Sequence, residues 1–150
     1  MIGPSEPIQA TTKEDPVPMS VREMLRAHPT PPAGEAQQLV RSIEECFACA
    51  QACTACVDAS LGEDDVIALR QCIRLCLDCA DVCDMTGRIA TRLTGGRSAS
   101  LATILELCAE TCRRSSEECQ KHAAHHEHCR VCADECKRCE EACREEIDAL

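Results

Sequence analysis

From about residue 33 onward, apolar and small side chains recur every three or four residues, with charged side chains between them. That spacing places the apolar positions on one face of an α-helix. The rhythm breaks at "SLGEDD" near 60–65, "TGGRS" at 94–98 and "KHAAHHEH" near 121–128. The first two breaks have glycine where a helix ends and Asp or Ser where the next begins, whereas the third lacks Gly and Pro. Four helices of roughly 24 to 32 residues with short connections predict an all-α, up-down-up-down antiparallel four-helix bundle.

The chain before this bundle divides into two parts. Residues 1–18 are rich in Pro, Thr, Ser and acidic side chains, have little to bury, and predict a disordered tail. In 19–32, "SVREMLRAHP" predicts a short helix over 20–27, followed by a linker. Three apolar side chains of this helix can face the bundle: Val21, Met24 and Leu25. Residues 33–150 form the bundle, which is long enough for one domain with its own core.

All 16 cysteines lie on the helical stripes. They are Cys46, Cys49, Cys53 and Cys56; Cys72, Cys76, Cys79 and Cys83; Cys108, Cys112 and Cys119; and Cys129, Cys132, Cys136, Cys139 and Cys143. Within each helix the spacing alternates between three and four, which is the seam that faces a bundle core. The one gap in the rhythm is filled by Ser115. The sequence therefore predicts a core lined with thiols.

Continuing the stripes outward predicts two different ends. At one end they reach only aliphatic positions: Leu39 and Ile43, Ile89 or Ala90 and Leu93, Leu101 and Ile104 or Leu105, and Ile147 and Leu150. At the other end the third stripe reaches His122, and the fourth begins from His125 or His126. His128 falls nominally off the stripe. We expect an aliphatic plug at one end of the thiol core and imidazoles at the other.

Composition and charge narrow the function. The formal net charge is −10, which disfavours nucleic acid, because duplex binding needs clustered Lys and Arg. No apolar run is long enough for a membrane span, and the N-terminus has no secretory signal pattern. We therefore predict a cytoplasmic protein whose thiols stay reduced or hold metal.

Metal binding explains the cysteines better than the alternatives. One or two core cysteines can be simple packing residues, but a whole core of them buries little apolar area. Cysteines three or four apart on a helix suit disulfides poorly. The straight stripes show no grouping into fours for zinc and no iron–sulfur spacing. Cu(I) is soft, accepts two or three sulfurs, and can share bridging thiolates, at a capacity on the order of one ion per cysteine.

The motifs "CFACAQACTAC", "CIRLCLDCADVC", "CAETC" and "CRVCADECKRCEEAC", with the histidines between the third and fourth helices, resemble the bacterial copper storage proteins of the cytosolic class. The resemblance covers roughly 33–150. It implies a four-helix bundle that stores many Cu(I) ions along its core and commonly assembles as a homotetramer. Ser115 departs from the stripe and lowers capacity locally, and the tail and short helix are unexplained by the shared core.

We predict a non-enzymatic store of multiple Cu(I) ions, with the 16 cysteines as ligands. His122, His125, His126 and His128 are candidate ligands that assist uptake at one end, because imidazole binds copper less tightly than thiolate does. A zinc or general soft-metal buffer, a thiol redox protein and a purely structural bundle remain alternatives. The number of coppers, the order of filling and the delivery partners do not follow from the sequence.

Overall fold

The computed structural model describes residues 20–34 and 36–150, so the predicted disordered tail at 1–18 lies outside the described residues. The elements are α1 (Ser20–Arg26), α2 (Gln37–Leu61), the 3-10 helix η1 (Val66–Leu69), α3 (Arg70–Ala90), α4 (Leu101–His122) and α5 (Glu127–Ala149). The prediction of an all-α four-helix bundle is confirmed. The four long helices have 25, 21, 22 and 23 residues. Three are shorter than predicted, because more residues than expected belong to the connections.

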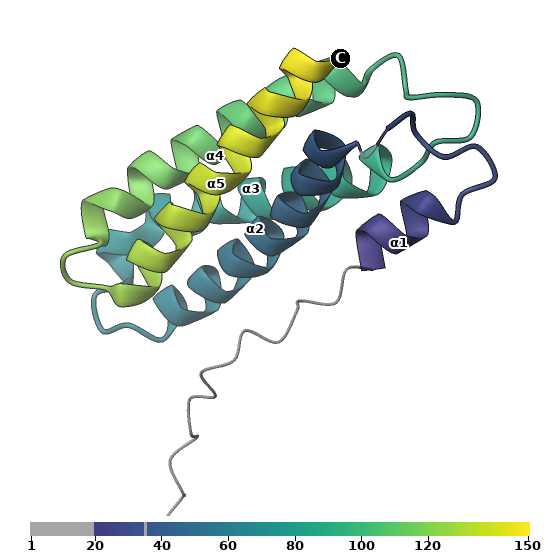
Figure 1. Cartoon of the computed structure of the whole chain (residues 1–150). Coiled ribbons are helices and arrows are strands. Elements are labelled where there is room, and N and C mark those ends of the chain that lie inside the picture. Colours follow the sequence, from purple (N-terminus) through teal and green to yellow (C-terminus); the bar gives the residue numbers. More distant parts are fainter. Residues whose placement is uncertain (1–19, 35) are drawn as a thin grey trace, which may run out of the picture.

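The four long helices form a ring. Helices that follow one another in sequence pack side by side, and α2 also packs against α5. Figure 1 shows the α2–α3 and α4–α5 connections at one end of the bundle, with the α3–α4 connection and the C-terminus at the other. Glycine at positive φ makes the α3–α4 turn, at Gly95 (φ 80°) and Gly96 (φ 94°).

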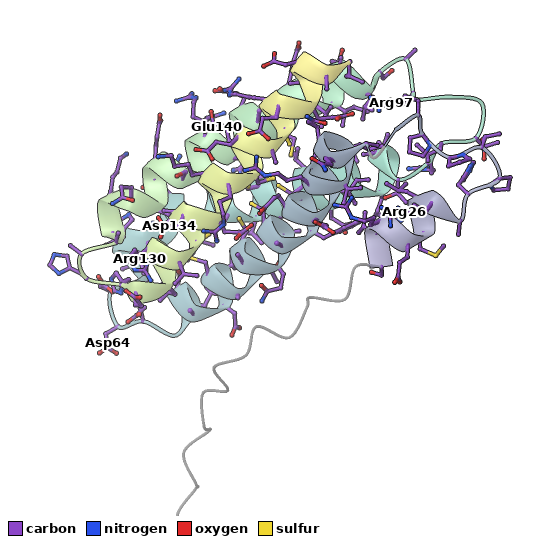
Figure 2. All side chains as sticks on the ribbon, in the orientation of Figure 1. Arg26, Asp64, Arg97, Arg130, Asp134 and Glu140 are labelled. Atoms are coloured by element: carbon purple, nitrogen blue, oxygen red, sulfur yellow. The ribbon has the colours of Figure 1, made fainter. Side chains whose placement is uncertain are left out.

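The predicted stripe faces the bundle axis. Each cysteine is at most 2% exposed. Figure 2 shows sulfur atoms between the helices and charged side chains on the outside, with Asp64 and Arg97 at opposite ends of the molecule. At the Arg97 end the core is aliphatic as predicted, with Leu39, Ile43 and Leu105 fully buried. The sequence left two alternatives for the stripe on α3, Ile89 or Ala90, and two on α4, Ile104 or Leu105. The structure buries Ala90 and Leu105.

The prediction for the end of the α5 stripe is wrong at Leu150, which is 53% exposed. Ile147 is partly buried and packs against the core, and Glu146, which was not predicted, is 1% exposed. The rhythm of three and four runs from Cys143 to Glu146, so the helix directs this carboxylate inward. Arg97, from the α3–α4 connection, donates a hydrogen bond from Nη1 to Glu146 Oε1 at 2.8 Å. An ion pair between a buried carboxylate and a partly exposed guanidinium therefore closes the aliphatic end.

The short helix α1 packs against α2. Leu25 is buried and Val21 partly buried against the core, as predicted. Met24 is 68% exposed, so the prediction that it faces the bundle is wrong. A helix of seven residues can direct only a narrow stripe toward its neighbour.

Candidate metal centre

Sulfur atoms from different helices lie in contact along the bundle axis. Cys46 Sγ is 3.8 Å from Cys108 Sγ and 3.9 Å from Cys143 Sγ, which joins α2 to α4 and α5. Cys72 Sγ of α3 is 3.3 Å from Cys119 Sγ of α4. All 16 thiols are free. The bundle thus concentrates reduced sulfur in its interior, away from solvent.

The thiols form groups of three and four whose sulfur atoms all lie within 4.8 Å of one another. These include Cys46/Cys108/Cys139/Cys143, Cys49/Cys83/Cys112/Cys139, Cys49/Cys53/Cys79/Cys136, Cys53/Cys76/Cys132 and Cys56/Cys72/Cys76/Cys119. The expectation that the cysteines do not group into fours is therefore wrong. It failed because each group draws on three or four helices, whereas the sequence shows only spacing within one helix.

Sulfur separation alone does not choose the metal. A tetrahedral zinc site with Zn–S bonds of about 2.3 Å has sulfur atoms about 3.8 Å apart. The thiol contacts of 3.3 to 4.0 Å include that value. The groups, however, share members: Cys139, Cys49, Cys53 and Cys76 each belong to two of them. Shared ligands favour a metal that accepts bridging thiolates in low coordination, as Cu(I) does.

Burial and neighbouring thiols raise the pKa of several cysteines of the core. Desolvation is the largest cause that raises the pKa of Cys129, to about 12. Hydrogen bonds from neighbouring thiols, Cys108 first, raise the pKa of Cys112 well above its ordinary value. A soft cation that replaces the proton leaves a neutral metal–thiolate unit, so filling the core buries little net charge.

The end opposite the ion pair is lined by histidine and carboxylate. His128 Nδ1 lies 3.4 Å from Cys56 Sγ and 3.5 Å from Cys129 Sγ, and Nε2 lies 3.0 Å from Glu63 Oε1. Desolvation lowers the pKa of His128, but hydrogen bonds with Cys56 and Glu63 outweigh it, so the pKa is raised. His126 lies beside His128, with 5.4 Å between ring centroids. The structure thus brings His128 into direct contact with two thiols, although it falls off the stripe.

The other three candidate histidines, all in the described part of the chain, make no hydrogen-bonding contact with sulfur. His126 contacts two carboxylates of the α2–α3 connection, with Nδ1 at 3.1 Å from Glu63 Oε1 and Nε2 at 3.3 Å from Asp65 Oδ2. His122 Nε2 lies 3.4 Å from Glu118 Oε1. His125 is exposed. The acidic residues Glu63 and Asp65, which the sequence analysis did not single out, hold the histidines because their connection lies at the same end as the α4–α5 turn.

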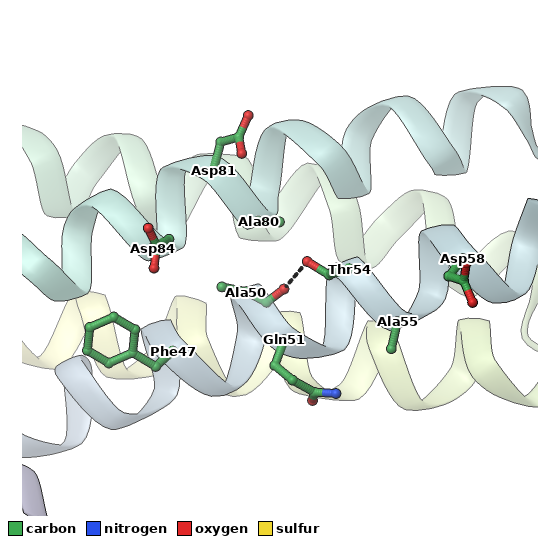
Figure 3. Close-up of a pocket in the computed structure, with 9 residues that line it drawn as sticks. All are labelled: Phe47, Ala50, Gln51, Thr54, Ala55, Asp58, Ala80, Asp81 and Asp84. Carbon is green, nitrogen blue, oxygen red and sulfur yellow. Dashed lines mark hydrogen bonds between the residues drawn. The ribbon is translucent and has the colours of Figure 1, made fainter.

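One surface groove is separate from the thiols. It lies on the outer face of α2 and α3, has a volume of about 590 Å³, and is shown in Figure 3. Its lining includes Phe47, Ala50, Ala80 and the carboxylates Asp81 and Asp84, and no cysteine. This groove is therefore not part of the metal centre.

Comparison with known proteins agrees with the thiol core. Residues 35–148 match the family model Csp, described as copper storage protein. A structure of the copper storage protein Ccsp from Streptomyces lividans, loaded with 10 copper equivalents, is 46% identical with a TM-score of 0.83, and the match covers 87% of this chain and 99% of that one. A second structure from that organism, with five coppers and described as a cytosolic copper storage protein, is 48% identical over 76% of this chain and 95% of its own, at a TM-score of 0.74.

Two further proteins are similar. Cu(I)-bound copper storage protein BsCsp3 is 36% identical with a TM-score of 0.62, and the match covers 69% of this chain and 92% of that one. The cysteine-rich protein YhjQ of Bacillus subtilis (strain 168) is 38% identical over 89 residues, which are 59% of this chain and 77% of YhjQ. Among the described helices, none combines the length and apolar character needed to cross a membrane.

Proposed function

The chain belongs to the copper storage protein family, and on that premise we propose that it stores many Cu(I) ions on the thiolates of its core. The observation that carries the proposal is the set of 16 buried free thiols, 15 of which lie in the overlapping groups described above. Each copper takes two or three sulfurs, and each sulfur bridges two coppers, so capacity is on the order of one copper per cysteine. Every Cu(I) that binds displaces protons from thiols.

The histidine end is the proposed site of copper uptake. His128 contacts two of the outermost thiols, Cys56 and Cys129, and its other nitrogen is held by Glu63. His126 is held in turn by Glu63 and Asp65. Imidazole binds Cu(I) less tightly than thiolate does, so a copper ion captured there passes inward downhill in free energy. Carboxylates beside the imidazoles add negative charge that attracts the cation.

We also propose that the protein is cytoplasmic, that it is not an enzyme, and that it assembles as a homotetramer. The location is supported by the relative described as cytosolic. The absence of catalysis is supported by the chemistry of the thiols, because a catalytic cysteine needs an activated environment distinct from its neighbours. The tetramer rests on the family resemblance, and sedimentation of the reduced protein tests it.

An anaerobic Cu(I) titration of the reduced protein against a chromophoric cuprous chelator tests the storage function. We expect tight uptake of more than about ten coppers per chain. Uptake of only one or two would refute storage. The same titration with Zn(II) present tests the zinc alternative, and prior zinc loading that blocks Cu(I) uptake would favour it. Defined disulfides after mild oxidation, with a few indispensable thiols, would favour the redox alternative.

A further inference from the structure

A second hollow adjoins the groove on the outer face of α2 and α3. It has a volume of about 450 Å³, and its lining includes Ser20, Val21 and Met24 of α1, Phe47 of α2 and Arg88 of α3. Phe47 also lines the first hollow, so the two meet at its ring. In Figure 3, Phe47 lies at one end of the first hollow and Asp58 at the other. Together the two hollows form one groove, the α2–α3 groove, which starts at the first residue of α1.

The α2–α3 groove has a preformed apolar part. A Cβ atom on Gly87 would lie 3.0 Å from Phe47 Cζ, so glycine at this position lets the ring lie close against α3. Phe47 is nevertheless 36% exposed, and Met24 beside it is 68% exposed. Covering such side chains removes apolar area from water and is favourable.

The charged groups of the groove are divided between its two hollows. Arg88 lines the hollow beside α1. The other hollow has three carboxylates, Asp58, Asp81 and Asp84. Asp84 pairs with Arg88 at 3.4 Å, whereas Asp58 and Asp81 have no ion-pair partner in the described part of the chain. Leading away from α1, the groove thus offers apolar surface, then a guanidinium, then unpaired carboxylates.

The segment that precedes α1 carries complementary groups in the same order. Residues 13–19 read "KEDPVPM". Going back from Ser20, this segment has apolar side chains first, then two carboxylates, then Lys13. Its two prolines fix φ and disfavour helix in the residues before them, so less conformational entropy is lost when it is held extended.

The length and attachment of the segment suit the groove. Seven residues in an extended polyproline conformation span about 22 Å. The α2 helix rises only about 16 Å between Phe47 and Asp58, so the segment can reach the carboxylates. Because Ser20 itself lines the groove, the tether gives the segment an effective concentration in the mM range, and weak affinity suffices for docking. The composition of the tail predicts no fold of its own, but docking on a formed surface needs none.

We propose that residues 13–19 dock in the α2–α3 groove of their own chain. The apolar side chains lie over Phe47, the carboxylates lie near Arg88, and Lys13 lies near Asp81. A second copy of the chain lacks the advantage of the tether. A partner that binds this face of the bundle must first displace the segment. This inference goes beyond the proposed copper storage and does not depend on it.

The ring of Phe47 gives a direct test, because it is the only Phe, Tyr or Trp ring in the chain. The full-length, reduced, metal-free protein is labelled on Phe and on Val methyl groups, and nuclear Overhauser effects from the ring are recorded. We expect a cross-peak between the Phe47 ring and the Val17 methyl groups. Its absence, with cross-peaks to neighbours such as Val21 present, would overturn the proposal. Placing the two labels on separate chains that are refolded together should abolish the Val17 cross-peak, and a cross-peak that survives would overturn docking within one chain.

Charge reversal tests the order of the groups. Lys13→Glu should lower the ratio of docked to free segment, read from the Val17 cross-peak, at least about twofold, because an exposed ion pair is lost. Lys13→Arg is the matched control and should keep the cross-peak. Combining Lys13→Glu with Asp81→Lys should restore it. An unchanged cross-peak in Lys13→Glu, or no recovery in the combined variant, would overturn the proposed arrangement. The copper capacity of each variant should equal that of the parent, and a low capacity in the parent would refute storage without bearing on docking.

Discussion

The ion pair at the closed end of the bundle gives a stability prediction whose size follows from burial. Glu146 is 1% exposed, and its hydrogen bond from Arg97 spans 2.8 Å. Replacing Arg97 by Met leaves the carboxylate buried without its partner. The variant can avoid a buried charge by protonating Glu146.

The cost of that protonation sets the upper limit. For a carboxyl group with an ordinary pKa of 4.5, protonation at pH 7 costs about 3.4 kcal/mol. A hydrogen bond to a charged group contributes at least about 1.5 kcal/mol. We therefore expect Arg97→Met to lower the free energy of unfolding by about 1.5 to 3.4 kcal/mol at pH 7.

The loss should depend on pH with a defined sign. Burial raises the pKa of Glu146 in the folded state, so the folded variant binds a proton more readily than the unfolded chain. Its deficit is therefore largest at neutral pH and shrinks as pH falls toward the unfolded pKa. At pH 5 the protonation cost is only about 0.8 kcal/mol.

Urea unfolding of the reduced, metal-free protein at fixed concentration, at pH 7 and pH 5, measures both effects. Arg88→Met is the matched control, because Arg88 pairs with Asp84 on the exposed surface at 3.4 Å, and it should cost less than about 0.5 kcal/mol. Arg97→Met with Glu146→Leu should recover most of the loss. An Arg97→Met deficit no larger than that of the control, or one equal at both pH values, would refute the reasoning.

Three further predictions concern the histidines, the thiols and a buried hydroxyl. Replacing His122 and His126 together by Ala should slow copper loading several-fold with nearly unchanged final capacity, and equal stopped-flow loading rates for variant and parent would contradict uptake at that end. Burial raises the pKa of the Cys129 thiol to about 12, so Cu(I) must displace a proton there. Each copper that displaces one proton should bind up to about tenfold more tightly for each unit by which pH increases. Chelator competition at pH 6.5 and 7.5 measures the affinity, and an unchanged affinity would argue against proton displacement. Ser60 Oγ is buried without a hydrogen-bond partner, so Ser60→Ala should raise the free energy of unfolding of the metal-free protein by about 1 kcal/mol. Ser42→Ala is the contrasting variant: it loses a 2.8 Å hydrogen bond and should lower the free energy of unfolding by about 1 kcal/mol.

The sequence predicted the thiol core because helical periodicity is a local property. A residue three or four positions from a buried cysteine shares its face of the helix, whatever the other helices do. The same rhythm applied to the end of α5 points to Glu146, but the prediction preferred the aliphatic Ile147 and Leu150. The prediction gave the polarity of Glu146 more weight than its place in the helical repeat. Arg97, which pairs with the buried Glu146 carboxylate, lies about 50 residues away in the chain.

Features that depend on how helices meet could not be predicted. The contact of His128 with Cys56 joins the first turn of α5 to the last turns of α2. Side chains in a helix lean toward its N-terminus, so a histidine in the first turn can reach over the end of the core although it is off the stripe. Glu63 and Asp65 contact the histidines because the α2–α3 and α4–α5 connections lie at the same end of the bundle. Only the three-dimensional arrangement shows them.

The regular repeat of the core has a consequence for how such a protein can change in evolution. Two stripe positions occur in every seven residues of each helix, so four helices supply eight core positions for about 10.5 Å of bundle length. Inserting seven residues in all four helices would lengthen the protein without altering the face that any existing residue presents. Capacity can therefore grow in proportion to length at constant cross-section, without a new site being built from the beginning. In this architecture the size of the store is set by helix length, and natural variation in length would be expected to track the amount of metal held.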